Sequence, residues 1–376
     1  MLLKYYAGWA DKIHGDTIPM TGDYFAYTRQ EPAGVAAQII PWNVPLGLLT
    51  GKLGPALAAG CTVVLKSAEQ TPLSALKLGE LIKEAGIPDG VVNIINGYGE
   101  DVGRYLAQHP DVDKIAFTGS CEVGLEIMKN SSANNKLKRV TLELGGKSPN
   151  IILDDADIDM AVWQANFALF PNQGQSCIAG SRTFVHEKIY DEFVEKSAKF
   201  ADNAKFGDTF DEATTDGPLI SKVQQDRVLD YIKIGQEQGA TLMTGGEPPD
   251  MKGYYVKPTV FADVKNDMTI AREEIFGPVM SILKFSDLDE VIEMANDTTF
   301  GLCSGVVTKD IGKALHLANA IRAGTVFVNC YNAISPSTPF GGFKNSGIGR
   351  EPGYPAVDAY LEKKTVVISR PPGSLP

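Results

Sequence analysis

The fold class is decided by one stretch near the start of the chain, VAAQIIPWNVPLGLLTGKLGPALAAGCTVVL, which comprises residues 35–65. Residues 35–40 are suited to a strand, residues 46–59 carry apolar side chains at helical spacing, and residues 62–65 form a second short β-branched run. Two neighbouring strands joined by a helix run parallel in one sheet. The helix crosses the sheet and carries the chain back to the end at which the first strand began. The stretch therefore predicts a βαβ unit.

The same alternation continues along the chain in two series. The first series adds helices at 73–85, 101–108 and 122–129 and strands at 91–95 and 114–117. The second series has helices at 160–170, 189–205, 223–238, 288–296 and 311–321, with strands at 183–185, 279–283, 305–307 and 325–329. This alternation predicts an α/β protein with two mostly parallel sheets, joined near Gly145 and Gly146.

Two flanking pieces fit neither series. Residues 17–29 contain the turn Thr21-Gly22-Asp23 and suggest a hairpin, and residues 364–369 suggest a terminal strand. Both are candidates for edge pairing with another chain.

Composition excludes several classes of protein. The 376 residues suffice for two to three domains, and the net charge of −11 argues against a nucleic-acid partner. No apolar run approaches the roughly 18 residues of a membrane span, so we expect no membrane partner. The five cysteines are odd in number and widely spaced, which disfavours a disulfide framework and favours a reducing compartment. Without CxxC or HExxH, we expect no metal site.

Cys177 is the first candidate for chemistry, within Gln173-Gly-Gln-Ser-Cys177-Ile-Ala-Gly180. Small and polar neighbours and two glycines would let a ligand approach the thiol closely. A cysteine is more commonly a small buried apolar residue, and that interpretation stands beside the catalytic one.

Glu143 is the second candidate, in Thr141-Leu-Glu143-Leu-Gly-Gly-Lys-Ser-Pro149. A carboxylate between two leucines of a β-like run is expensive to bury without a partner, so it could serve as a general base with a raised pKa. Equally, it could lie on the solvated face of an alternating strand. Thr141 occupies the position of the first glycine of a P-loop, so that motif is absent.

Glycine-rich turns follow two expected strands of the first series. Gly97 and Gly99 follow one strand, and Gly119, Ser120 and Gly124 follow another, where backbone N–H groups could receive a pyrophosphate. Ordinary turn glycines are the alternative. Lys66 and Glu69 follow a third strand and could bind ribose hydroxyls or form a surface ion pair.

Four motifs in fixed order give a family resemblance: Pro41-Trp42-Asn43, Glu143-Leu-Gly-Gly-Lys-Ser-Pro, Gln173-Gly-Gln-Ser-Cys177 and Glu274-Ile-Phe276-Gly-Pro. With these motifs the chain resembles the aldehyde dehydrogenase family, most closely its NAD-linked class 1 and class 2 animal-type enzymes, from about residue 5 to residue 368. The resemblance implies a Rossmann-like cofactor domain, an α/β catalytic domain and a small β oligomerisation hairpin and strand.

The resemblance also implies roles for individual residues. Cys177 would add to an aldehyde, Asn43 would help to hold the oxyanion, and Glu143 would activate water to hydrolyse the thioester. Lys52 and Glu351 match positions linked to proton transfer. The NAD-binding set would comprise Ile39, Pro41, Trp42, Lys66, Glu69, Gly99, Gly119, Ser120, Gly124, Leu144, Glu274 and Phe276.

The resemblance implies four regions: a helix and hairpin at 1–33, an NAD-binding domain at 34–145, a catalytic domain at 146–345, and a return to the cofactor domain with an oligomerisation strand at 346–376. We expect a homo-oligomer, dimer or tetramer, in the cytoplasm, with the mitochondrion as the alternative. Family members carry a further N-terminal segment before the position of Met1. The alternative function is therefore a chain that keeps the fold without dehydrogenase activity.

Overall fold

The computed structural model describes residues 1–371 and residue 373, which divide into two units. Of the described residues, unit 1 comprises 1–143, 335–340, 348–371 and 373, and unit 2 comprises 144–334 and 341–347. The division after Glu143 lies two residues before the domain boundary expected from the sequence, and the last part of the chain belongs mainly to unit 1.

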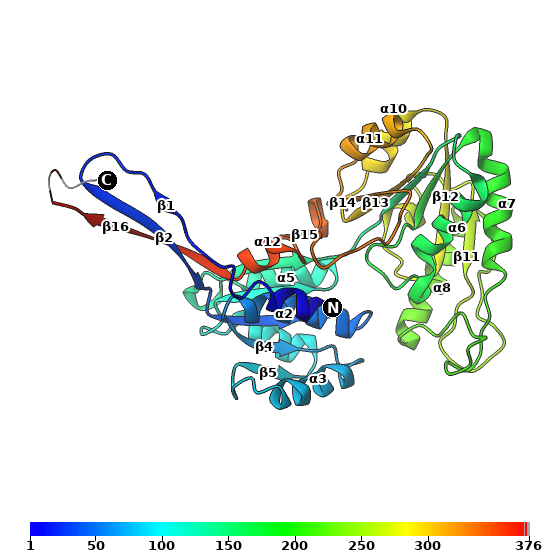
Figure 1. The fold of residues 1–376 in the computed structure, drawn as a ribbon. Helices are drawn as coiled ribbons and strands as arrows, with labels where there is room; N and C mark the ends of the chain where they lie inside the picture. Colours follow the sequence, from blue (N-terminus) through cyan, green and yellow to red (C-terminus); the bar gives the residue numbers. More distant parts are fainter. Residues whose placement is uncertain (372, 374–376) are drawn as a thin grey trace. The chain divides into compact units, whose positions relative to one another are not determined.

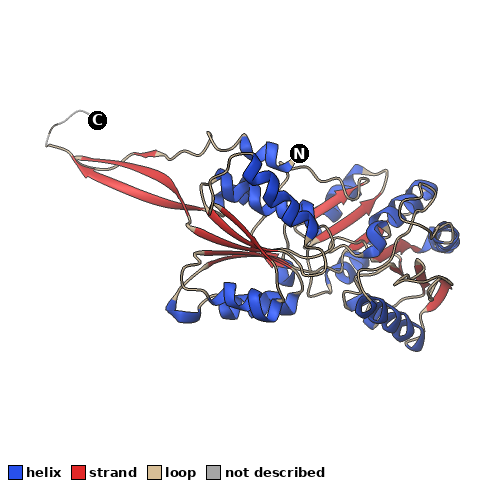
Figure 2. Cartoon of the chain, turned by 90° about the horizontal axis from the view of Figure 1, so that it is seen from below, coloured by secondary structure: helices blue, strands red, loops and turns tan. Residues whose placement is uncertain are grey.

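A six-stranded sheet forms the centre of unit 1, in the order β15-β7-β6-β3-β4-β5. Its strands are β3 (Val35–Ile39), β4 (Thr62–Lys66), β5 (Val92–Ile95), β6 (Lys114–Thr118), β7 (Arg139–Glu143) and the short β15 (Gly347–Ile348). The pairs from β7 to β5 are all parallel, as the alternation of strands and helices predicts. Helices lie on both faces of this sheet (Figure 2).

Six helices belong to unit 1: α1 (Leu2–Ala7), α2 (Pro45–Ala58), α3 (Leu73–Glu84), α4 (Arg104–Gln108), α5 (Cys121–Asn130) and α12 (Tyr354–Asp358). Helix α2 shows how the sequence sets the packing. Pro45 starts the helix at a position where its missing N–H is not needed. Leu49, Leu53 and Ala56 are buried at helical spacing, and Lys52 is buried on the same face.

A three-stranded antiparallel sheet completes unit 1 (Figure 1). The expected hairpin is present as β1 (Thr17–Ile18) and β2 (Tyr24–Pro32), and the expected terminal strand is β16 (Leu361–Ser369). These strands pair within one chain, since β16 lies along β2 from Leu361–Pro32 to Ser369–Tyr24. The edges that remain open to another chain are therefore those of β1 and β16.

Unit 2 is built on a seven-stranded sheet in the order β10-β11-β12-β9-β8-β13-β14. The strands are β8 (Pro149–Ile152), β9 (Arg182–His186), β10 (Thr241–Thr244), β11 (Thr259–Ala262), β12 (Val279–Phe285), β13 (Cys303–Val307) and β14 (Thr325–Val328). Only β10 is antiparallel to its neighbour. The sequence analysis did not anticipate β8, β10 or β11.

Six helices belong to unit 2: α6 (Ile158–Leu169), α7 (Tyr190–Ala201), α8 (Lys222–Glu237), α9 (Thr269–Arg272), α10 (Leu288–Asn296) and α11 (Ile311–Ala320). Apolar side chains pack on both faces of the sheet, with Phe184, Phe261 and Val306 in one cluster and Phe193, Val185 and Ile282 in the other. Among the described residues, no helix is both long and apolar enough to span a membrane.

Candidate active site

The predicted cofactor-binding residues of unit 1, and the predicted catalytic residues Asn43 and Glu143, lie at one edge of its six-stranded sheet. They occupy the carboxyl ends of neighbouring parallel strands, with Ile39, Pro41, Trp42 and Asn43 at β3, Lys66 and Glu69 at β4, Gly99 after β5, Gly119, Ser120 and Gly124 after β6, and Glu143 at the end of β7. Open parallel sheets bind their ligands at this edge. Two of the four sequence motifs, those of Asn43 and Glu143, thus lie there with the glycine turns.

Backbone hydrogen bonds hold these strand ends together. The N–H of Ile40 donates to the carbonyl of Lys66 at 3.1 Å, and the N–H of Gly119 donates to the carbonyl of Glu143 at 3.1 Å. The glycine turn and the candidate base are therefore fixed to each other through the backbone.

The glycine turns leave backbone open to a ligand. No atom lies within 4 Å of the position that a Cβ on Gly99 would take. Ser120 caps α5, its Oγ accepting the N–H of Val123 at 3.4 Å, so the helix begins directly after the Gly119 turn. An exposed turn glycine and a helix N-terminus together suit an anionic group such as a pyrophosphate.

Lys66 and Glu69 form a loose ion pair. Their Nζ and Oε2 atoms are 3.6 Å apart, with the lysine buried and the glutamate side chain 38% exposed. The ion-pair interpretation is thus correct, and the exposed carboxylate remains accessible to ribose hydroxyls.

Glu143 is buried at the last position of β7, so the interpretation as a solvated strand residue is wrong. Both carboxylate oxygens lack a hydrogen-bond partner among the described residues. Burial raises the pKa of Glu143 well above its ordinary value, and the nearby carboxylate of Glu351 raises it further. The charges of Lys52 and Arg350 oppose that shift. A buried carboxyl with a raised pKa takes up a proton more readily than an ordinary one, which would suit a general base.

Lys52 and Glu351 form an ion pair in the interior of unit 1. The Lys52 Nζ donates to the two carboxylate oxygens of Glu351 at 2.8 and 3.0 Å, and its side chain is fully buried. Because both residues affect the pKa of Glu143, the structure groups the three residues that the sequence separates by up to 299 positions.

Cys177 lies in the loop before β9, in unit 2, and is half-buried. The turn that precedes it is unusual, because Asn172, Gln173 and Gly174 all have positive φ angles between 55° and 67°. Gln175 stabilises the turn, donating to the carbonyl of Asn172 at 3.2 Å and accepting the N–H of Ile220 at 2.9 Å. The half-buried position disagrees with an ordinary core cysteine.

Gly146 allows two site segments to approach each other within unit 2. A Cβ at Gly146 would lie 2.5 Å from the carbonyl oxygen of Cys177, so only glycine fits there. The N–H of Gly146 donates to Oε1 of Glu274 at 2.9 Å. A small hollow adjoins this contact, and its lining includes Gly146, Ser176, Glu274 and Phe276. Leu144 is buried two residues before Gly146.

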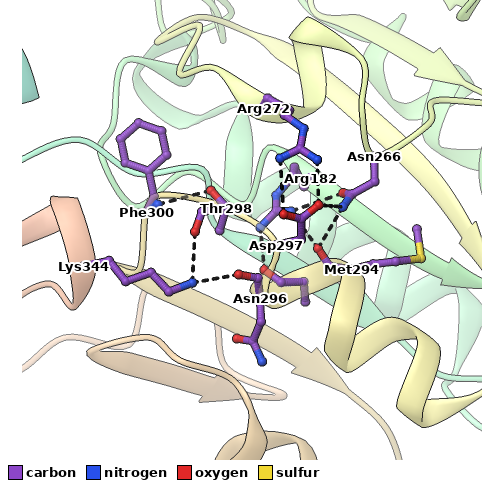
Figure 3. A network of polar contacts seen from close by, with 10 residues as sticks. Arg182, Asn266, Arg272, Met294, Asn296, Asp297, Thr298, Phe300 and Lys344 are labelled. Carbon is purple, nitrogen blue, oxygen red and sulfur yellow. Dashed lines mark hydrogen bonds and ion pairs between the residues drawn. The ribbon is translucent and has the colours of Figure 1, made fainter.

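A polar network joins Arg182 of β9 to the C-terminal end of α10 (Figure 3). Arg182 donates to the carbonyls of Lys147 at 3.0 Å, Met294 at 3.2 Å and Ala295 at 2.8 Å. The latter two belong to the C-terminal turn of α10, whose carbonyls lack helical partners. The sequence analysis did not identify Arg182, because no local pattern shows which distant carbonyls it meets.

The structure thus defines a class of protein. It is an α/β protein of two units: one has glycine turns at the carboxyl ends of its parallel strands, and the other has a cysteine in a loop next to glycines. The family model described as the aldehyde dehydrogenase family matches residues 1–366. The chain belongs to this family.

Several relatives support that assignment. The mitochondrial aldehyde dehydrogenase of Mesocricetus auratus is 58% identical over 98% of this chain and 74% of its own length. Retinal dehydrogenase 2 of Mus musculus is 57% identical over 98% of this chain and 71% of its own length. The NAD+ complex of a Bacillus cereus aldehyde dehydrogenase superimposes with a TM-score of 0.95 at 53% identity, covering 97% of this chain and 74% of that chain.

Proposed function

We propose that this chain oxidises aldehydes to carboxylic acids with NAD, through a covalent intermediate on Cys177. Family membership supports the reaction class. The observation that carries the assignment of residues is the carboxylate of Glu143, which is buried without a hydrogen-bond partner among the described residues at the carboxyl edge of the sheet.

Cys177 begins the proposed reaction as a thiolate. Its sulfur adds to the aldehyde carbon, a C–S bond forms, and the carbonyl electrons move onto oxygen to give a thiohemiacetal. The amide of Asn43 and the backbone N–H of Cys177 stabilise that oxyanion, where one donor typically contributes about 2.7–4 kcal/mol. The electrons on oxygen then re-form the C=O bond as a hydride leaves the same carbon, which gives a thioester on Cys177; NAD would supply the acceptor for that hydride.

Glu143 completes the reaction by hydrolysing the resulting thioester. Its carboxylate removes a proton from water, the hydroxide oxygen adds to the acyl carbon, and the C–S bond breaks. The acid leaves and the Cys177 thiolate is regenerated. The test is to incubate the protein with NAD and a panel of aldehydes and to measure NADH and carboxylic acid. We expect the two products in equal amounts. A protein that forms neither product overturns the proposal.

The residues at the sheet edge of unit 1 fit NAD. We propose that Lys66 and Glu69 bind the adenosine ribose, that the Gly99 and Gly119–Gly124 turns receive the pyrophosphate, and that Ile39, Pro41 and Trp42 line the dinucleotide. In unit 2, Leu144, Glu274 and Phe276 would hold the nicotinamide end.

Glu69 should make the protein select NAD over NADP. A 2′-phosphate would meet the exposed carboxylate of Glu69, and like charges a few ångströms apart at a surface repel by several kcal/mol before screening. We expect kcat/KM to be at least about tenfold higher with NAD, and Glu69→Gln to narrow the ratio. Steady-state kinetics with one aldehyde and both cofactors measure it, with Glu80→Gln on the exposed face of α3 as a control. Equal efficiency with both cofactors in the unchanged protein would contradict this role.

We also propose a homo-oligomer, dimer or tetramer, formed through the β1–β2–β16 sheet. Large apolar side chains on this thin sheet are exposed, among them Phe25 at 39%, Val367 at 53% and Ile368 at 46%. Such side chains commonly mark an interface.

An aspartate at Val367 should therefore weaken self-association. The buried carboxylate would be unpaired in the interface, and light scattering after gel filtration should show a smaller assembly for Val367→Asp than for the unchanged chain. Val223→Asp is the control, because Val223 is 80% exposed at the start of α8 in unit 2. An unchanged mass for Val367→Asp would count against this interface.

For the compartment we propose the cytoplasm, with the mitochondrion as the alternative. The wide spacing and odd number of cysteines support a reducing compartment. Relatives from several mammals carry the word mitochondrial in their names, which supports the alternative.

A further inference from the structure

Tyr331 contacts the loop that carries Cys177, and both the tyrosine and the loop belong to unit 2. The tyrosine follows β14 and is 7% exposed. Its hydroxyl donates to the carbonyl oxygen of Ile178 at 2.7 Å. Ile178 is the residue after Cys177, so this bond acts on the backbone next to the nucleophile.

The ring of Tyr331 packs closely over two glycines that leave room for it. A Cβ on Gly305 would lie 2.6 Å from the ring, and a Cβ on Gly180 would lie 3.3 Å from it. The ring of Phe327 packs against it with centroids 5.0 Å apart. The hydroxyl is therefore fixed by the fit of the ring, and removing the oxygen alone should leave that fit intact.

The backbone after Cys177 is held from both sides. The carbonyl oxygen of Cys177 lies 2.5 Å from the position that a Cβ on Gly146 would take, and the next carbonyl along the chain accepts the bond from Tyr331. The N–H of Ala179 also donates to the carbonyl of Ser176 at 3.1 Å, which closes a turn around Cys177 and Ile178. Two successive peptide groups after the nucleophile are thus constrained.

The Tyr331 hydroxyl remains a hydrogen-bond donor at every pH at which Cys177 would be ionised to the thiolate. Burial raises the pKa of Tyr331 well above its ordinary value, and the nearby thiols of Cys303 and Cys177 raise it further. The hydroxyl therefore keeps its proton across the pH range in which a cysteine ionises.

We propose that Tyr331 is a positioning residue for Cys177: its hydroxyl holds the Ile178 carbonyl and so fixes the backbone that aims the nucleophile. This inference rests on the proposed function of Cys177. A misplacement of about 1 Å can lower a rate about 100-fold, so one bond at this position can matter for catalysis.

Tyr331→Phe tests the inference because it removes only the hydroxyl. We expect the alkylation of Cys177 by iodoacetamide and the NADH burst to slow about 10- to 100-fold, with the KM for NAD unchanged. Mass spectrometry of the alkylated peptide identifies Cys177 as the modified residue.

Tyr190→Phe is the matched control. Tyr190 is 3% exposed in the same unit, and its hydroxyl accepts the backbone N–H of Asp263 at 2.7 Å. This variant also loses a buried hydrogen bond but should alkylate and turn over normally. If Tyr331→Phe also kept normal alkylation and turnover, with only a comparable fall in Tm, Tyr331 would be structural and the inference would be wrong.

If the proposed function itself is wrong, the experiments give a different result from the one that overturns the role of Tyr331. In that case the unchanged protein would form no NADH, or its NADH formation would survive Cys177→Ala. Normal, Cys177-dependent turnover together with an unaffected Tyr331→Phe variant would overturn the positioning role alone.

Discussion

Cys177→Ala should form no NADH above background with any aldehyde, a loss of at least about 10⁴-fold in kcat. Without the sulfur there is no thiohemiacetal, and the hydride has no tetrahedral carbon to leave. The substitution removes a half-buried side chain in a loop whose conformation depends on Gln175, Gly146 and neighbouring backbone bonds. The Tm should therefore change little. NADH formation and thermal unfolding of the same preparations measure both effects.

Cys330→Ala provides the matched control, because Cys330 is an exposed thiol in the same unit. We expect it to retain full turnover and to leave iodoacetamide inactivation unchanged. If Cys177→Ala kept more than about 1% of the turnover, another nucleophile would be needed and the assignment of Cys177 would be wrong.

The parallel sheets could be predicted from sequence because their strands carry an unambiguous local pattern. The runs at 35–40 and 62–65 are short, apolar and separated by a helix that begins at a proline, and β3, α2 and β4 follow within one residue of the expected ends. Strands β10 and β11 lie near the edge of the second sheet, and only β10 is antiparallel to its neighbour. They interrupt the alternation on which the prediction relied.

The sequence predicted which residues belong to the candidate site, but not which residues contact one another. From the sequence, Glu143 could be a buried general base or a solvent-exposed strand residue. Which side of a strand faces solvent depends on the helices that cover the sheet, and these are not visible in the local sequence. Lys52 gave no local sign of its partner, since Glu351 is 299 residues away. Tyr331 meets Ile178 across 153 residues, and only the folded chain brings them together. Long-range pairing of this kind leaves no periodic trace in the sequence.

Glu143→Gln should separate the two halves of the reaction. The amide cannot take a proton from water, so the thioester should accumulate and steady-state turnover should fall about 10²- to 10⁴-fold. Formation of the first NADH needs no general base at this position, and a burst of about one NADH per active Cys177 should remain. Rapid-mixing absorbance measures the burst and the steady state together. Glu84→Gln, at the exposed end of α3 and outside the proposed site, is the control with normal turnover.

The raised pKa of Glu143 makes a second, independent readout possible. Steady-state turnover of the unchanged protein should fall as the pH drops through that raised pKa, because the carboxylate becomes protonated. For stability the sign is opposite. Ionisation of a carboxyl with a raised folded pKa is unfavourable in the folded state, so stability is lost as the pH rises above the unfolded value of about 4.3.

Glu143→Gln removes that loss of stability. The Tm of the variant relative to the unchanged protein should therefore increase between pH 4 and pH 8, although its turnover is lower throughout. A Tm difference that does not change with pH would mean that Glu143 ionises as easily as in the unfolded chain. The loss of turnover in Glu143→Gln would then need a cause other than the removal of a desolvated base.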